Sequence, residues 1–358
     1  MKNNRYLVTL IIYITAIFLL MGVQVLASLG CFNALSDQMV EVVGSVLPQI
    51  VVMFGVPLIM LLSAQKINHE PVSLKQVNQF VGWHRMSFKN VILCLVLGVC
   101  LYLFNIFVAS FFGSFLKSFG YQFNSNDNAF TGYSGLAISI ILTAVLPGIC
   151  EEFLHRGVLL NGMIKQLGVR NAVLWTSFLF GLMHMNVGQF FYASILGWFL
   201  TMGALASGSL WGSIILHFTN NALATYFSYA EELNLPGARL MNAVLGNWVS
   251  IILTLLVVVI LIGEILRIMA RDKFNRNLDS YTVRYLASQN QFNVEDFDKI
   301  RAVLPRAIRT MPTWKATMSY VETFDQPQRT KPIERALLTA VWVAGAALTV
   351  LSFIWGRW

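Results

Sequence analysis

Long apolar runs separated by short polar stretches recur along the whole chain. About 20 mostly apolar residues span the roughly 30 Å hydrocarbon layer of a membrane, and nine runs approach or exceed that length. They centre on residues 7–27, 43–62, 91–116, 134–154, 172–184, 190–206, 212–229, 249–268 and 336–355. The pattern predicts an all-α fold, a polytopic membrane helix bundle of about eight to nine transmembrane helices.

The composition supports this class of protein. Hydrophobic residues make up 56% of the 358 residues and charged residues only 12%, about half the charge density of soluble domains. Intrinsically disordered, collagen-like, coiled-coil and disulfide-scaffold proteins are excluded by the same numbers. The four cysteines match no metal-binding or redox spacing and read as small apolar side chains: Cys31, Cys94, Cys100 and Cys150.

The loop charges predict an orientation. With the N-terminus in the cytoplasm, the basic loops fall inside and most acidic loops outside, as the positive-inside rule requires. The net charge of +8 is then explained by loops that face anionic lipid, and no nucleic-acid partner is expected. We expect five parts: N-terminal helices 1–90, a catalytic membrane core 91–230, an additional helix 231–270, a basic, folded cytoplasmic segment 271–335 and a C-terminal helix 336–358.

Two adjacent carboxylates, Glu151 and Glu152, stand in the fourth apolar run. Ionisable groups at membrane depth are costly, so they usually face a cavity and serve a function. Arg156 follows Glu152 by one helical turn, and His155 follows Glu151 by one turn. A Glu152–Arg156 pair would leave Glu151 free to act as a general base. The structural alternative is a helix whose charged end reaches the cytoplasmic interface.

Two later runs carry further polar residues. His184 ends the fifth run, one turn after Phe180, while His217 and Asn221 share a helical face in the seventh. A single intramembrane histidine is more often a packing residue. Polar elements on three successive predicted helices instead indicate one shared site.

The three elements occur in a fixed order along the chain: Glu151-Glu152-xxx-Arg156, Phe180-xxx-His184 and His217-xxx-Asn221. Together they resemble the motifs of the CAAX-protease and bacteriocin-processing (CPBP, or Abi) family of intramembrane endopeptidases. The resemblance covers about residues 134–228 and leaves the C-terminal part outside it. It implies hydrolysis of a peptide bond by an activated water molecule.

The resemblance also implies roles for the individual residues. Glu151 and His184 would deprotonate the water, and His217 and Asn221 would stabilise the oxyanion. Glu152 would be held by Arg156.

Family members have also been called metalloproteases, and a rival reading makes Glu151, His184 and His217 a zinc-binding set. No HExxH pattern is present, so the usual zinc-protease signature gives no support. We therefore favour hydrolysis without a metal and keep zinc as the alternative cofactor.

The expected partners are membrane lipids and a lipidated, CAAX-like or hydrophobic peptide substrate. A bacterial plasma membrane is the expected location, by analogy with the bacterial branch of the family. Two other functions remain open: a transporter or channel with a Glu/His relay, and a non-catalytic scaffold or bacteriocin immunity protein.

The predicted depths of the motif residues conflict. His184 falls near the outer side, whereas His217 lies about 12 Å from the inner end of its helix. The conflict is removed if the fourth and fifth helices extend into the cytoplasm through residues 157–171, which lowers Glu151 and His184. The site should then open to the cytoplasmic side, where the N-terminus lies.

Overall fold

The computed structural model describes residues 5–122, 129–288, 294–309 and 330–355. Within these ranges the regular structure is helical throughout and contains no strand. The all-α prediction is therefore confirmed.

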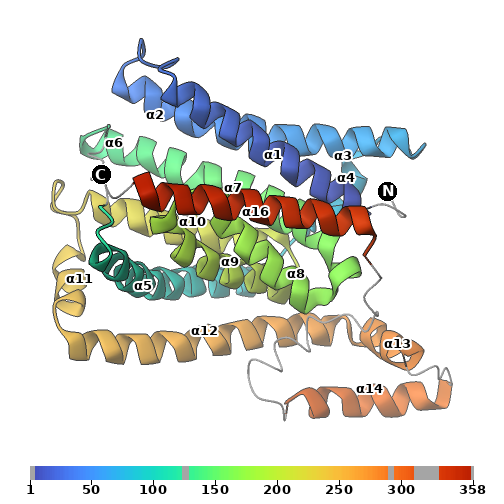
Figure 1. Ribbon diagram of the computed structural model, residues 1–358. Helices are drawn as coiled ribbons and strands as arrows, with labels where there is room; N and C mark the ends of the chain where they lie inside the picture. The colour runs from blue at the N-terminus through green and yellow to red at the C-terminus, as the bar shows by residue number, and fades with distance from the viewer. Residues whose placement is uncertain (1–4, 123–128, 289–293, 310–329, 356–358) are drawn as a thin grey trace.

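The helices form an elongated bundle in which most axes run roughly side by side (Figure 1). The first group is α1 Arg5–Ser28, α2 Asp37–Val46, η1 Leu47–Gly55, α3 Val56–Ile67, α4 Leu74–Phe80 and α5 Phe88–Ser118. The central group is α6 Gly132–Ile140, η2 Ile141–Val145, α7 Leu146–Glu152, η3 Phe153–Leu160, α8 Asn161–Met183, α9 Val187–Ser207 and α10 Leu210–Ser228. The last group is α11 Ala238–Leu245, α12 Trp248–Arg276, α13 Leu278–Ser288, α14 Val294–Arg309 and α16 Pro332–Trp355.

Each of the nine predicted apolar runs falls on one of these helical units. Seven helical units of the described chain are long and apolar enough to cross a membrane. The number is smaller than nine because residues 132–183 count as one unit and α10 is not among the seven. Transmembrane helices thus make up most of the protein, and the predicted count of eight to nine is approximate.

Two of the long helical units contain π-helical segments. The segments η1 and η2 each lead into an α-helix with a proline in its first turn, Pro57 and Pro147. Proline lacks the N–H that an α-helix would use, and a widened turn lets the helix continue past it. A third segment, η3, follows Glu152 directly. The candidate site is therefore built on irregular helix.

The chain reverses direction inside the unit labelled α8. Gly168 has φ 76° and ψ 159°, a backbone conformation open only to glycine at low cost. Gly157 packs against Val81 and Leu210. Leu210 begins α10, directly after the turn from α9, and its N donates to Gly82 O at 2.8 Å. Gly157 thus lies at the level of that turn. Residues 158–167 therefore continue the helical unit beyond that turn, while the predicted extension of the fourth and fifth helices into the cytoplasm stays a prediction.

The packing removes the conflict over depth, because the centre of the Phe180 ring lies 5.3 Å from that of His184 and 5.7 Å from that of His217. Counting at 1.5 Å per residue from the level of Gly157 and Leu210, Glu151 lies roughly 9 Å and His217 roughly 10 Å into the bundle. The two motif helices therefore bring these residues to one level.

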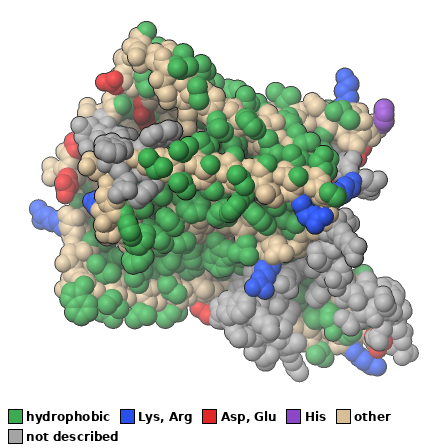
Figure 2. All heavy atoms as spheres, in the orientation of Figure 1, with side chains coloured by type: hydrophobic (Ala, Val, Ile, Leu, Met, Phe, Trp, Pro, Cys, Tyr) green, Lys and Arg blue, Asp and Glu red, His purple; other side chains and the backbone are tan. Residues whose placement is uncertain are grey.

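The two ends of the bundle differ in charge. Lys and Arg gather mainly at the end where α4, α13 and the N-terminus lie, and Asp and Glu mainly at the other end on the face seen in Figure 2. Helix α12 packs against α5 and α9, and helix α16 packs against α8 and α9. The basic end is the one that the positive-inside rule assigns to the cytoplasm, and this orientation stays a prediction.

Candidate active site

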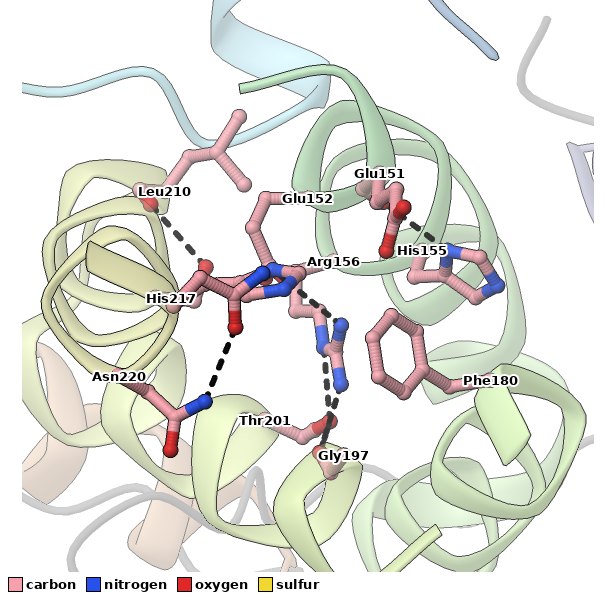
Figure 3. A network of polar contacts seen from close by, with 12 residues as sticks. Glu151, Glu152, His155, Arg156, Phe180, Gly197, Thr201, Leu210, His217 and Asn220 are labelled. Atoms are coloured by element: carbon pink, nitrogen blue, oxygen red, sulfur yellow. Dashed lines mark hydrogen bonds and ion pairs between the residues drawn. The ribbon is translucent and has the colours of Figure 1, made fainter. Parts of the chain in front are cut away.

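Glu152 is the centre of a buried ionic cluster (Figure 3). Its side chain is 0% exposed, and its Oε1 accepts from Arg156 Nη1 at 2.7 Å and from His217 Nδ1 at 2.9 Å. The Arg156 contact joins neighbouring turns of one helix, as the spacing predicts. The His217 contact joins α7 to α10 and could not be read from spacing. Glu152 is thus paired with two of the predicted site residues.

Arg156 is fixed by contacts on three further sides. Its Nη2 donates to Gly197 O at 2.8 Å, its Nε donates to Thr201 Oγ1 at 3.2 Å, and its guanidinium lies 4.4 Å from the centre of the Phe180 ring. The missing side chain of Gly197 permits the approach, because a Cβ there would lie 3.2 Å from Arg156 Nη2. An always-charged, planar group so enclosed acts as a structural counter-ion for Glu152.

Phe180 connects the histidines of the site. Its ring lies edge-on to His155, His184 and His217, with centroids 5.0, 5.3 and 5.7 Å apart. His155 is fully buried and its Nδ1 bonds Glu151 O at 2.9 Å. Phe180, named in the sequence only as a motif residue, therefore sets the spacing of the three imidazoles.

His184 is held in one tautomer. Its Nδ1 lies 2.9 Å from Phe180 O, one turn earlier in α8. A carbonyl oxygen can only accept, so Nδ1 carries the proton and Nε2 of the neutral ring has a free lone pair. That nitrogen can take a proton from water.

Glu151 faces a cavity instead of the ionic cluster. The cavity, about 460 Å³, is also lined by His184, Gln49 and residues of α1 and α2. Glu151 is 7% exposed and its Oε1 accepts from Gln49 Nε2 at 2.8 Å. The adjacent acids are therefore divided between a cavity that can admit water and a closed salt bridge.

The cavity extends to the end of the bundle that we did not expect. It reaches Phe32 in the connection between α1 and α2 and Val40 on α2, at the end of α1 opposite to the N-terminus (Figure 1). This cavity does not support the expectation that the site opens to the cytoplasmic side, which stays a prediction.

Asn221 bonds a backbone carbonyl and a neighbouring side-chain amide. Its Nδ2 donates to Thr143 O at 2.9 Å, and its Oδ1 accepts from Asn220 Nδ2 at 2.9 Å. His217 and Asn221 both lie on α10, as the sequence predicts, but Asn221 is bonded to η2. In this arrangement the Asn221 amide links α10 to η2, which leads into α7, the helix of Glu151.

The proposed zinc set does not assemble among the described residues. No group of three His, Cys, Asp or Glu side chains in that part of the chain is placed to hold a metal ion. His217 is not among the residues that line the cavity shared by Glu151 and His184. The donor set therefore does not fit zinc in this conformation.

Comparison with known proteins identifies the central helices. Residues 133–223 match the model of a protein family described as Type II CAAX prenyl endopeptidase Rce1-like. This segment is similar to that family. The match contains all three motifs and confirms the resemblance seen in the sequence. No curated protein and no solved structure matches the chain.

Gln49, Thr201 and Thr143 belong to the site but were missed by sequence reasoning. Thr201 and Thr143 contact motif residues through hydrogen bonds that only the helix packing creates. Gln49 offered one signal, since it is an uncharged polar residue in the middle of the second apolar run.

Proposed function

We propose that the protein is an intramembrane endopeptidase that hydrolyses a peptide bond of a membrane-associated substrate, lipidated or hydrophobic, with water activated by Glu151 and His184. The Rce1-like match supports a protease of the CAAX type. The observation that carries the mechanism is that Glu151 and His184 line the same cavity. A transporter relay would require a polar path across the bundle, whereas the ionic cluster beside this cavity is closed.

The chemical step follows from these positions. A water molecule between Glu151 and His184 Nε2 gives a proton to one of them, and the resulting hydroxide adds to the scissile carbonyl carbon. The tetrahedral oxyanion then collapses, the C–N bond breaks, and the proton passes to the leaving amine. No metal is needed to balance these steps.

His217 and Asn221 are the proposed oxyanion donors. Glu152 accepts a hydrogen bond from His217 Nδ1–H. When His217 is protonated, its second N–H, at Nε2, is available to donate to an oxyanion. Asn221 uses one N–H of its Nδ2 on Thr143 O, and the second N–H of the same amide can donate to an oxyanion.

The test uses the purified protein in detergent with a prenylated CAAX reporter peptide and a panel of hydrophobic peptides. Glu151→Gln should abolish cleavage, because the amide cannot take a proton from water. Glu264→Gln is the matched control, since Glu264 is paired with Arg267 on α12, away from the site. Equal cleavage by wild type and Glu151→Gln would contradict the mechanism, and no cleavage of any peptide by wild type would contradict the activity.

A further inference from the structure

Gln49 reaches the candidate site from outside the three motifs. It lies on η1, is 8% exposed, and its bonded partner Glu151 is 102 residues away along the chain. The segment η1 packs directly against α7. Among the described residues, Gln49 is the one side chain that donates a hydrogen bond to the Glu151 carboxylate.

A second buried glutamine on the same helical unit shows what a structural role looks like. Gln65 is 2% exposed, and both halves of its amide bond the backbone of Ser73: Nε2 donates to O and Oε1 accepts from N. Gln65 therefore fastens a loop and leaves no polar atom unused.

Gln49 is bonded through one half of its amide only. Its Oε1 is buried and has no partner within the described part of the chain. A buried acceptor without a donor is unfavourable, so burial alone does not explain a glutamine at this position. The carboxylate of Glu151 can only accept, which places Nε2 toward Glu151 and turns Oε1 away from it.

We propose that Gln49 is a positioning residue that holds one oxygen of Glu151 and so directs the other toward the water bound beside His184. The inference rests on the proposed function. Both Gln49 and Glu151 line the cavity with His184, so the bond fixes the carboxylate at the cavity wall. Without it, the Glu151 side chain is free to rotate away from His184, and small displacements of a reacting group reduce turnover strongly.

The kinetic test compares Gln49→Met with Gln65→Met in the full-length protein. Gln49→Met keeps the side-chain length and should lower kcat roughly 100-fold while KM stays within about twofold. Gln65→Met should leave kcat unchanged. Gln49→Glu, which keeps the size but replaces the donor by an acceptor, should be as slow as Gln49→Met.

A second measurement does not depend on activity. In a double-mutant cycle of Gln49→Met and Glu151→Met, the equilibrium constant of unfolding should show a coupling of about tenfold, or ~1.4 kcal/mol. The cycle of Gln65→Met with Glu151→Met should show none. Additive effects for the Gln49 pair would overturn the contact, and a full kcat for a folded Gln49→Met would overturn the positioning role. An inert wild type would instead contradict the proposed function, while the coupling would still report the contact.

Discussion

The buried Glu152–Arg156 pair gives the most direct test of the site's architecture. We expect Arg156→Met to destabilise the protein severely, because it leaves the Glu152 carboxylate in the bundle without its cationic partner. Methionine matches much of the arginine side chain in length, so a cavity contributes little to the loss. The prediction thus concerns the charge.

The magnitude follows from the contacts of the pair. At 2.7 Å and an effective dielectric constant of about 20, the Coulomb attraction is about 6 kcal/mol. The cost of removing both charges from water opposes it, and breaking one side of such a buried pair costs about 3–5 kcal/mol. We expect the upper part of this range, because Glu152 Oε2 already has no partner among the described residues.

The double variant Arg156→Met/Glu152→Gln should recover much of the loss. The carboxylate charge is gone, and the glutamine can still accept from His217. What remains lost are the hydrogen bonds of Arg156 to Gly197 O and Thr201 Oγ1, about 1–2 kcal/mol together.

The assay is the free energy of unfolding from denaturant titrations in mixed micelles, for the wild type, both single variants and the double variant. Far-ultraviolet circular dichroism monitors the loss of helix. A double variant no more stable than Arg156→Met would refute the reasoning, because it would show that the uncompensated charge is not the source of the loss.

Three further outcomes follow from other parts of the molecule. Cys31 is exposed at the α1–α2 end, whereas the other cysteines are buried. A membrane-impermeant maleimide should therefore label the wild-type protein in intact cells and fail to label a Cys31→Ser variant. Labelling of the wild type only after permeabilisation would reverse the predicted orientation. Gly181→Ala should lower the free energy of unfolding by about 1–3 kcal/mol, because its Cβ would lie 2.0 Å from Ser194 Oγ and 2.7 Å from Phe190 O, while Gly22→Ala, with open space around it, should change it little. Dialysis against a zinc chelator should leave peptide cleavage unchanged, and recovery of a lost rate on adding zinc would contradict the metal-free mechanism.

The membrane-helix content of the fold was predictable because one physical requirement dominates it. A segment that crosses the hydrocarbon layer must be helical, long and apolar, and each of these properties is visible in the sequence. The reversal at Gly168 was not visible as a boundary, because it depends on one glycine in a polar stretch. The separate apolar run 172–184 predicts the helix that follows the reversal. It does not predict how far the helices on the two sides of Gly168 extend beyond their neighbours.

The candidate site was predictable only where its contacts lie within one helix. The spacing of Glu152 and Arg156 gives their ion pair directly, since residues four apart are neighbours. The contacts of His217 with Glu152 and of Gln49 with Glu151 depend on how α10 and η1 pack against α7. Motif order brought His217 into consideration, but no motif includes Gln49.

Helix geometry makes the adjacent carboxylates of Glu151 and Glu152 face different surroundings. Successive residues of a helix are turned by about 100°, so Glu151 and Glu152 cannot face the same neighbours. Glu152 turns toward α10 and the guanidinium of Arg156, where two donors neutralise it. Glu151 turns toward η1 and the cavity, where its one described donor is an uncharged amide. Glu151 therefore meets the cavity and Glu152 is enclosed by its two donors, a difference that fits the proposed roles of Glu151 in proton transfer and of Glu152 in support.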